Sequence, residues 1–152
     1  MLSTISFAFE LPTGRTVLTV NGLISNTNSA DSALFDQKML DQLPQQTITT
    51  HTPWSEGKHT YTGFNAEALF KLVGIQGNTL NITALNDYTI EMPIDDFITN
   101  GAIFATHMNG VPMTIRNKGP IMVVYPFDER PQLKIETYFA RSIWQIKSVS
   151  VK

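Results

Sequence analysis

The 152-residue chain contains no cysteine, no long apolar run and no block of like charge. Without cysteine it can form no disulfide, no thiolate metal site and no cysteine nucleophile. Every apolar run is far shorter than the roughly 18 residues that cross a bilayer, so we expect no membrane-spanning segment. Eleven basic and thirteen acidic residues give a formal net charge of −2 without a basic run, which argues against a nucleic-acid partner.

The common catalytic motifs are also missing. The sequence has no glycine-rich phosphate loop, no G-x-S-x-G and no H-E-x-x-H. Its three histidines, His51, His59 and His107, are widely spaced, so we expect surface or loop histidines and no metal site.

With 42% hydrophobic residues, the chain is expected to form one domain over residues 11–152. Residues 1–10 have two open interpretations. They are either the remnant of a secretory signal, with a small-x-Ala cleavage site at Ser6-Phe7-Ala8, or an N-terminal strand.

Apolar periodicity and turn residues predict short elements throughout the chain. Alternation, β-branched runs and a fully apolar run together predict strands at 16–21, 47–52, 80–84, 88–92, 102–108, 121–125 and 142–151, whereas 53–61 is predicted to be irregular. Helices are predicted at 36–43, after an Asn65 cap up to Gly74, and at 95–98, with Leu34 and Phe35 counted in the first apolar face. Asn109-Gly110 predicts a tight hairpin. The prediction is an α+β fold, a single domain with a mixed, mainly antiparallel sheet and short helices.

Three segments combine polar and aromatic residues where a simple core would not need them: 50–54, 85–88 and 114–120. Tyr138, Arg141 and Trp144 form a fourth group of this kind. A pocket with a flat aromatic ring, a carboxylate, amides and fixed cations suits a planar heterocycle, because the ring stacks while the polar groups bind its edge.

Each of these residues also has an ordinary structural explanation. Trp54 after Pro53 is often a loop anchor, and Asn86-Asp87 is equally a turn. Arg116 and Lys118 are typical of a solvated loop, and Arg141 of a partner for a surface carboxylate such as Asp128 or Glu129.

Several motifs in order resemble the oxidoreductase molybdopterin-binding domain of the sulfite oxidase type, from about Thr16 to the C-terminus. They are T-P-W at 52–54, A-L-N-D-Y at 84–88, M-N-G-V-P-M at 108–113 and K-G-P-I-M-V-V-Y-P at 118–126. With the terminal R-x-x-W-Q at 141–145, the chain is most similar to small stand-alone bacterial members, which are usually exported. That resemblance implies a periplasmic location and a pterin ligand. It also implies a partner, the periplasmic domain of a membrane-anchored cyclic-di-GMP enzyme or kinase.

The sequence departs from the catalytic family at its centre. In the molybdoenzymes a cysteine thiolate ligates molybdenum on the segment that here reads Thr49-Thr50-His51-Thr52. A threonine oxygen does not replace a soft thiolate, although His51 offers a nitrogen.

Our first hypothesis is therefore a non-catalytic protein that binds a pterin without molybdenum. Trp54 and Tyr88 are predicted to stack on the ring or line its pocket, and Asn86 and Asp87 to bond the aminopyrimidine edge. The remaining predicted site residues are Arg116, Lys118 and Arg141, facing the pterin oxygens or tail, together with His51, Thr52 and Tyr138.

Two alternatives stay open. One is a molybdopterin-dependent oxidoreductase subunit with an unusual ligand such as His51, and the other is a protein-interaction module with a vestigial pocket. Molybdopterin carries a phosphate and usually a nucleotide, which need several cations, so the few cations near the site favour a simple pterin.

Overall fold

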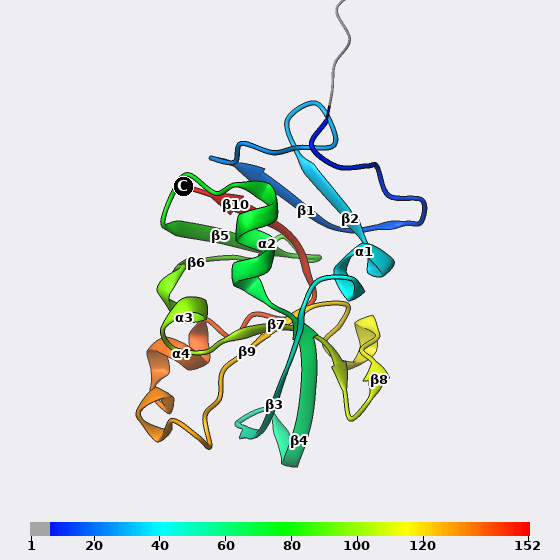
Figure 1. Ribbon diagram of the computed structural model, residues 1–152. Helices are drawn as coiled ribbons and strands as arrows, with labels where there is room; N and C mark the ends of the chain where they lie inside the picture. The colour runs from blue at the N-terminus through cyan, green and yellow to red at the C-terminus, as the bar shows by residue number, and fades with distance from the viewer. Residues whose placement is uncertain (1–6) are drawn as a thin grey trace, which may run out of the picture.

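Ten strands form two five-stranded sheets within residues 7–152, the part of the chain that the computed structural model describes (Figure 1). The first sheet has the order β2 (Ala33–Asp36), β1 (Thr16–Gly22), β10 (Ile146–Val151), β5 (Thr79–Ala84) and β6 (Thr89–Pro93). Strands β1 and β10 run parallel with Thr19 opposite Ser148, and the other pairs are antiparallel. The two ends of the domain therefore meet at the centre of one sheet.

The second sheet is antiparallel throughout. Its order is β3 (Gln45–Thr52), β4 (Ser55–Phe64), β7 (Ile103–Met108) and β8 (Val111–Pro112), and β9 (Met122–Val124) also pairs with β7. Asn109 and Gly110 join β7 to β8 with φ values of 54° and 80°, the positive values that a type I′ turn requires.

Helix α2 (Ala66–Val73) crosses one face of the first sheet (Figure 1). Asn65 caps it through a 2.8 Å bond from the Ala68 amide, and Gly74 ends it in the left-handed conformation at φ 63°. Its buried residues join Leu18 and Ile82 in the main core cluster. The remaining helical elements are α1 (Gln37–Asp41), α3 (Asp95–Ile98), α4 (Glu136–Ala140) and the 3₁₀ turns η1 (Ile115–Asn117) and η2 (Pro131–Leu133).

The predicted α+β single domain is confirmed, with its strands divided between two sheets. The irregular segment predicted at 53–61 is wrong, because β4 occupies most of it and its Thr60 and Thr62 hydroxyls pair with threonines of β3. Leu34 and Phe35 belong to β2 and not to a helix, and the last strand begins at Ile146 instead of 142.

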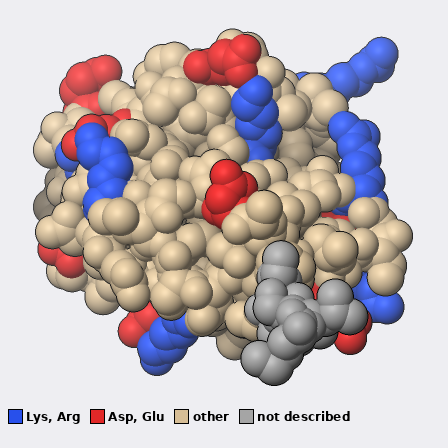
Figure 2. Space-filling model, turned by 90° about the horizontal axis from the view of Figure 1, so that it is seen from above, with Lys and Arg blue, Asp and Glu red and all other residues tan. Residues whose placement is uncertain are grey.

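The prediction for the N-terminus lies partly outside the described residues. Residues 7–10 form no strand, and the signal interpretation of residues 1–6 concerns the part that is not described. No helix in residues 7–152 is long and apolar enough to cross a membrane. On the face shown in Figure 2, basic and acidic side chains are scattered among other residues and form no large patch of one sign.

Candidate functional site

Two neighbouring hollows lie where the predicted pterin residues were expected. The larger, of about 320 Å³, lies between the β5–β6 turn and the segment 139–145. The smaller, of about 200 Å³, lies beside the β3–β4 turn and shares Phe139 with the larger. We call them together the tryptophan cleft, because Trp54 and Trp144 pack against each other here with ring centroids 5.8 Å apart. The smaller hollow is lined by His51, Thr52, Pro53, Phe127, Lys134 and Phe139, and the larger includes Asn86, Tyr88, Ile143 and Gln145.

Trp54 lies in the tight turn between β3 and β4, where its ring packs against Trp144. Its ring meets Phe127 edge-on at 6.5 Å and contacts both core clusters. Within the described part of the chain, the buried indole Nε1 nevertheless has no hydrogen-bond partner, and neither has the buried Oγ1 of Thr52 two residues earlier. A buried polar group without a partner costs about 1–3 kcal/mol. These two atoms therefore mark a place where a bound molecule or water would complete the hydrogen bonding.

Lys118 brings a cation to the same cleft. It sits at φ 80° after the η1 turn, and its Nζ lies 5.5 Å from the centroid of the Trp144 ring. Two hydrogen bonds from Gln145, just before β10, fix the loop that carries Lys118. The backbone N–H of Gln145 donates to the Lys118 carbonyl at 3.0 Å, and its side-chain Nε2 donates to the Ile115 carbonyl at 2.7 Å. Because Gln145 follows Trp144 directly, these bonds keep the Lys118 loop beside the Trp144 ring and so support the cation–π contact.

His51 is held at the mouth of the smaller hollow. Its Nδ1 lies 2.7 Å from Oδ2 of Asp128, and Lys134 approaches the other carboxylate oxygen at 3.6 Å. The Asp128 amide donates in turn to Oγ1 of Thr50 at 3.0 Å. The hydrogen bond from His51 is the main cause that lowers the pKa of the Asp128 carboxyl below its usual value. Since Asp128 engages Nδ1, Nε2 is the ring nitrogen left to face a ligand.

The β5–β6 turn divides the predicted edge-binding residues. Asn86 and Tyr88 line the larger hollow, and Tyr88 is 53% exposed. Asp87, in the left-handed region at φ 69°, points its carboxylate to Lys147 at 2.5 Å. Of these three predicted residues, the structure therefore brings Asn86 and Tyr88 to the cleft and gives Asp87 an intramolecular partner.

Arg141 has a partner that the sequence did not reveal. Its Nη1 lies 3.0 Å from Oδ2 of Asp96, a carboxylate whose side chain is 3% exposed. Tyr125 donates to the same oxygen at 2.7 Å, and burial together with that bond raises the pKa of Tyr125 far above its usual range. The expected pairing with Asp128 or Glu129 is wrong, because α4 directs Arg141 towards α3.

Six of the ten predicted site residues lie outside the lining of both hollows, namely Trp54, Asp87, Arg116, Lys118, Tyr138 and Arg141. Tyr138 packs against Tyr125 at 5.3 Å and under the Arg141 guanidinium at 5.8 Å. Arg116 is exposed on η1, and it forms no ion pair with any residue of the described part. Neither Arg116, Tyr138 nor Arg141 lines the cleft, so a contact of these residues with a ligand stays a prediction.

Sequence reasoning missed several residues of the cleft lining, among them Phe127, Lys134, Phe139 and Gln145. The R-x-x-W-Q motif contains Gln145 and was a usable signal. Phe139 has no such signal, because an apolar ring on a short helix looks like any core residue.

The donor set near His51 does not fit a molybdenum ion ligated in the manner of the molybdoenzymes. Threonine hydroxyls and one imidazole replace the thiolate. Within residues 7–152 no three His, Asp or Glu side chains converge as a metal site would need. The flat aromatic rings, the Lys118 cation and the unpartnered Trp54 nitrogen fit an organic heterocycle instead.

Comparison with known proteins gives the class first. The chain shares its fold with the crystal structure of the sulfane dehydrogenase SoxCD from Paracoccus pantotrophus, which matches with a TM-score of 0.66 at 16% sequence identity. The match covers 95% of this chain and 40% of that chain, so the protein corresponds to well under half of its structural neighbour. The chain belongs to the family described as the oxidoreductase molybdopterin binding domain, whose profile matches residues 18–128. No curated protein matches the sequence.

Proposed function

We propose that this protein binds a pterin in the tryptophan cleft without molybdenum, and that it acts as a ligand-binding protein and not as an enzyme. The family supports a pterin-like ligand, and the lack of any cysteine separates this chain from thiolate-ligated molybdenum chemistry.

One observation carries this proposal. The rings of Trp54 and Trp144 pack together, Trp144 lines the larger hollow and lies under Lys118, and the buried Trp54 Nε1 donor has no acceptor among residues 7–152. A pterin offers a flat ring to stack and carbonyl and ring-nitrogen acceptors at its edge. Its binding would satisfy the indole donor, whose unpaired burial otherwise costs about 1–3 kcal/mol.

We extend the proposal to a signalling role in the periplasm. The resemblance to exported stand-alone members supports it, with the partner being the periplasmic domain of a membrane-anchored cyclic-di-GMP enzyme or kinase. The exposed Tyr88 and Trp144, 53% and 39% exposed, lie at the cleft, where a partner would sense whether it is filled.

A molybdopterin-dependent oxidoreductase subunit is the second candidate function. It is favoured by the structural neighbour, which is named a dehydrogenase. In that case His51, whose Nε2 is left available, is the residue that would approach the metal.

The first experiment is to purify the protein from its native host, release its small molecules, and measure pterins by mass spectrometry and molybdenum by elemental analysis. A stoichiometric pterin without molybdenum supports the proposal, and stoichiometric molybdenum with a phosphorylated pterin overturns it in favour of the oxidoreductase. If neither a pterin nor molybdenum is found, the ligand-free protein is titrated with pterin.

That titration has a built-in reporter. Trp54 and Trp144 are the two tryptophans of the chain, so the tryptophan fluorescence comes from the cleft alone. We expect saturable quenching by pterin, abolished or weakened in Trp54→Ala and unchanged in the control Ile98→Ala, an exposed apolar residue on α3. Absence of quenching in the wild type would leave the interaction module as the better account.

A further inference from the structure

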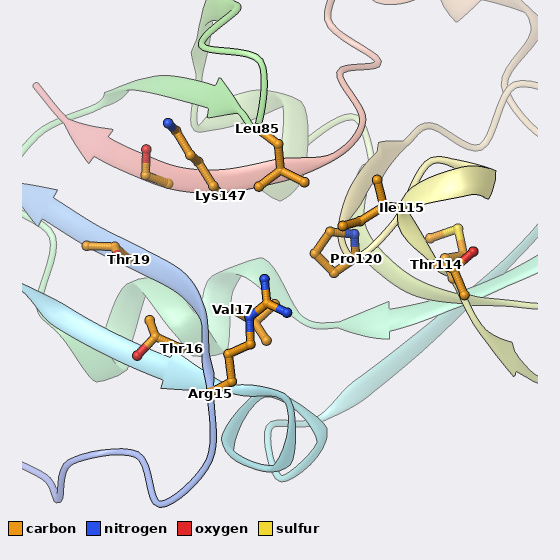
Figure 3. Close-up of a pocket in the computed structure, with 11 residues that line it drawn as sticks. Arg15, Thr16, Val17, Thr19, Leu85, Thr114, Ile115, Pro120 and Lys147 are labelled. Carbon is orange, nitrogen blue, oxygen red and sulfur yellow. The ribbon is translucent and has the colours of Figure 1, made fainter.

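A larger cavity, of about 400 Å³, is lined in part by Leu85 of the β5–β6 turn (Figure 3). It is formed by the beginning of β1, the beginning of β10 and the 113–120 loop. Its principal lining residues are Arg15, Val17, Leu85, Ile115, Pro120 and Lys147. A volume of this size is in the range of small-molecule sites, about 300–1,000 Å³.

Arg15 supplies a free cation to this cavity. Figure 3 shows its guanidinium beside Val17 and turned towards Pro120. Within the part of the chain that the structure describes, Arg15 forms no ion pair, and no acidic residue lines the cavity. The other lining cation, Lys147, is already paired with Asp87 at 2.5 Å. The cavity therefore presents one uncompensated positive charge with a planar array of donors.

The rest of the lining is apolar with hydroxyls at the strands. Leu85 and Ile115 are 39% and 54% exposed, although both are large hydrophobic residues that are usually covered. They extend from the β5–β6 turn and from η1, and both line the same cavity (Figure 3). Thr16 and Ser148 add hydroxyls on the strand side. This combination of apolar walls with a few polar groups is typical of a ligand site.

The cavity is distinct from the tryptophan cleft. The two share no lining residue, even though Leu85 lines one and the adjacent Asn86 the other. The 2.7 Å bond from Gln145 to the Ile115 carbonyl joins a residue of the cleft to a residue of the cavity. Because the two linings share no residue, binding in the cavity can be measured without filling the cleft.

We propose that this cavity is a second ligand site, which takes a small apolar carboxylic acid. The carboxylate accepts two parallel hydrogen bonds from the Arg15 guanidinium, and the apolar body packs against Val17, Leu85 and Ile115. A monoanion matches the single free cation, whereas a phosphate dianion would leave charge uncompensated with Lys147 engaged by Asp87.

The test uses the ¹⁵N-labelled full chain, with benzoate as the probe and benzamide as its neutral isostere. We expect benzoate to shift the amide signals of residues 15–19, 114–115 and 147–148 with a Kd on the order of 1 mM, the range for a fragment of this size. Benzamide should bind at least fivefold more weakly, because it lacks the charge that Arg15 recognises. Arg15→Gln should raise the benzoate Kd about tenfold, and Ile115→Ser should raise it severalfold.

Lys58→Gln serves as the charge-matched control, because Lys58 is exposed on the β3–β4 ribbon and does not line the cavity. Its benzoate Kd should stay within twofold of the wild type. Equal binding of benzoate and benzamide, or an unchanged Kd in folded Arg15→Gln, overturns the proposal. So do benzoate shifts confined to Tyr88 and residues 143–145, which would assign the acid to the tryptophan cleft. No pterin is used, so a failure here is independent of the pterin proposal.

Discussion

Replacing Arg141 by methionine tests whether this residue stabilises the fold or contacts a ligand. In the structure its guanidinium compensates Asp96, whose side chain is 3% exposed and which also accepts the Tyr125 hydroxyl. Methionine keeps much of the length and apolar stem but removes the charge. Asp96 is then left in the interior with hydrogen bonds from Tyr125 and Asn100 and without its cation.

The magnitude follows from burial. Removing one partner of a buried ion pair costs about 3–5 kcal/mol, because the other charge is left uncompensated. The Arg141 side chain is 26% exposed, so water partly replaces it and the lower end, about 3 kcal/mol, applies. In a domain of this size that corresponds to a fall in Tm of roughly 6–12 °C.

The assay is urea denaturation and thermal melting at neutral pH, together with the pterin titration. We expect Arg141→Met to lose about 3 kcal/mol in its free energy of unfolding, while the pterin Kd of the folded protein stays within about threefold. The double variant Asp96→Asn/Arg141→Met should regain at least half of the loss, since an amide needs no cation. Arg116→Met, an exposed arginine without an ion pair in the described residues, should change stability by less than about 0.5 kcal/mol. Unchanged stability of Arg141→Met with a tenfold weaker pterin affinity would refute the structural role.

Three further predictions concern the cleft and the sheets. Trp54→Ala should weaken pterin binding by about 1–3 kcal/mol, measured by calorimetry on protein shown to be folded, and an unchanged affinity would remove Trp54 from the stacking role. Because His51 lowers the pKa of Asp128 below its usual 3.8, the ionised carboxylate favours the native state above that pH and loses the effect as pH falls through the lowered pKa. The Tm difference between wild type and Asp128→Asn should therefore be full near neutral pH and shrink as the pH falls below 3.8, and a difference independent of pH would contradict this. A Cβ at Gly63 would collide with the Phe104 carbonyl oxygen of the neighbouring strand, so Gly63→Ala should lose about 2–3 kcal/mol in urea denaturation, and a loss under about 0.5 kcal/mol would show that the strands can separate locally.

Local signals in the sequence predicted most of the elements. The Asn65 cap and the Gly74 terminus of α2 depend on residues a few positions apart, and both are present. The Asn109-Gly110 turn is equally local, because it depends on the backbone freedom of two adjacent residues. The β4 strand escaped prediction because its regularity comes from pairing with β3 on one side and β7 on the other.

The candidate site was predicted in part. The motifs T-P-W and A-L-N-D-Y do meet at the tryptophan cleft through Trp54, Asn86 and Tyr88. Asp87 turned to Lys147, which lies 60 positions away in the sequence, and no local pattern foretells such a partner. The cavity at Arg15 could not be predicted for the same reason, since four separate segments of the chain enclose it.

The sequence alone determined the family, the α+β class and the absence of a thiolate for molybdenum, because motif order, periodicity and residue type can be read along the chain. The tertiary structure decided which polar residues line a cavity and which stabilise the interior. Arg141 and Lys118 read alike in sequence, yet one neutralises buried Asp96 and the other lies over Trp144. The physical reason is that a charge takes its role from the groups around it, and the fold brings these from distant segments.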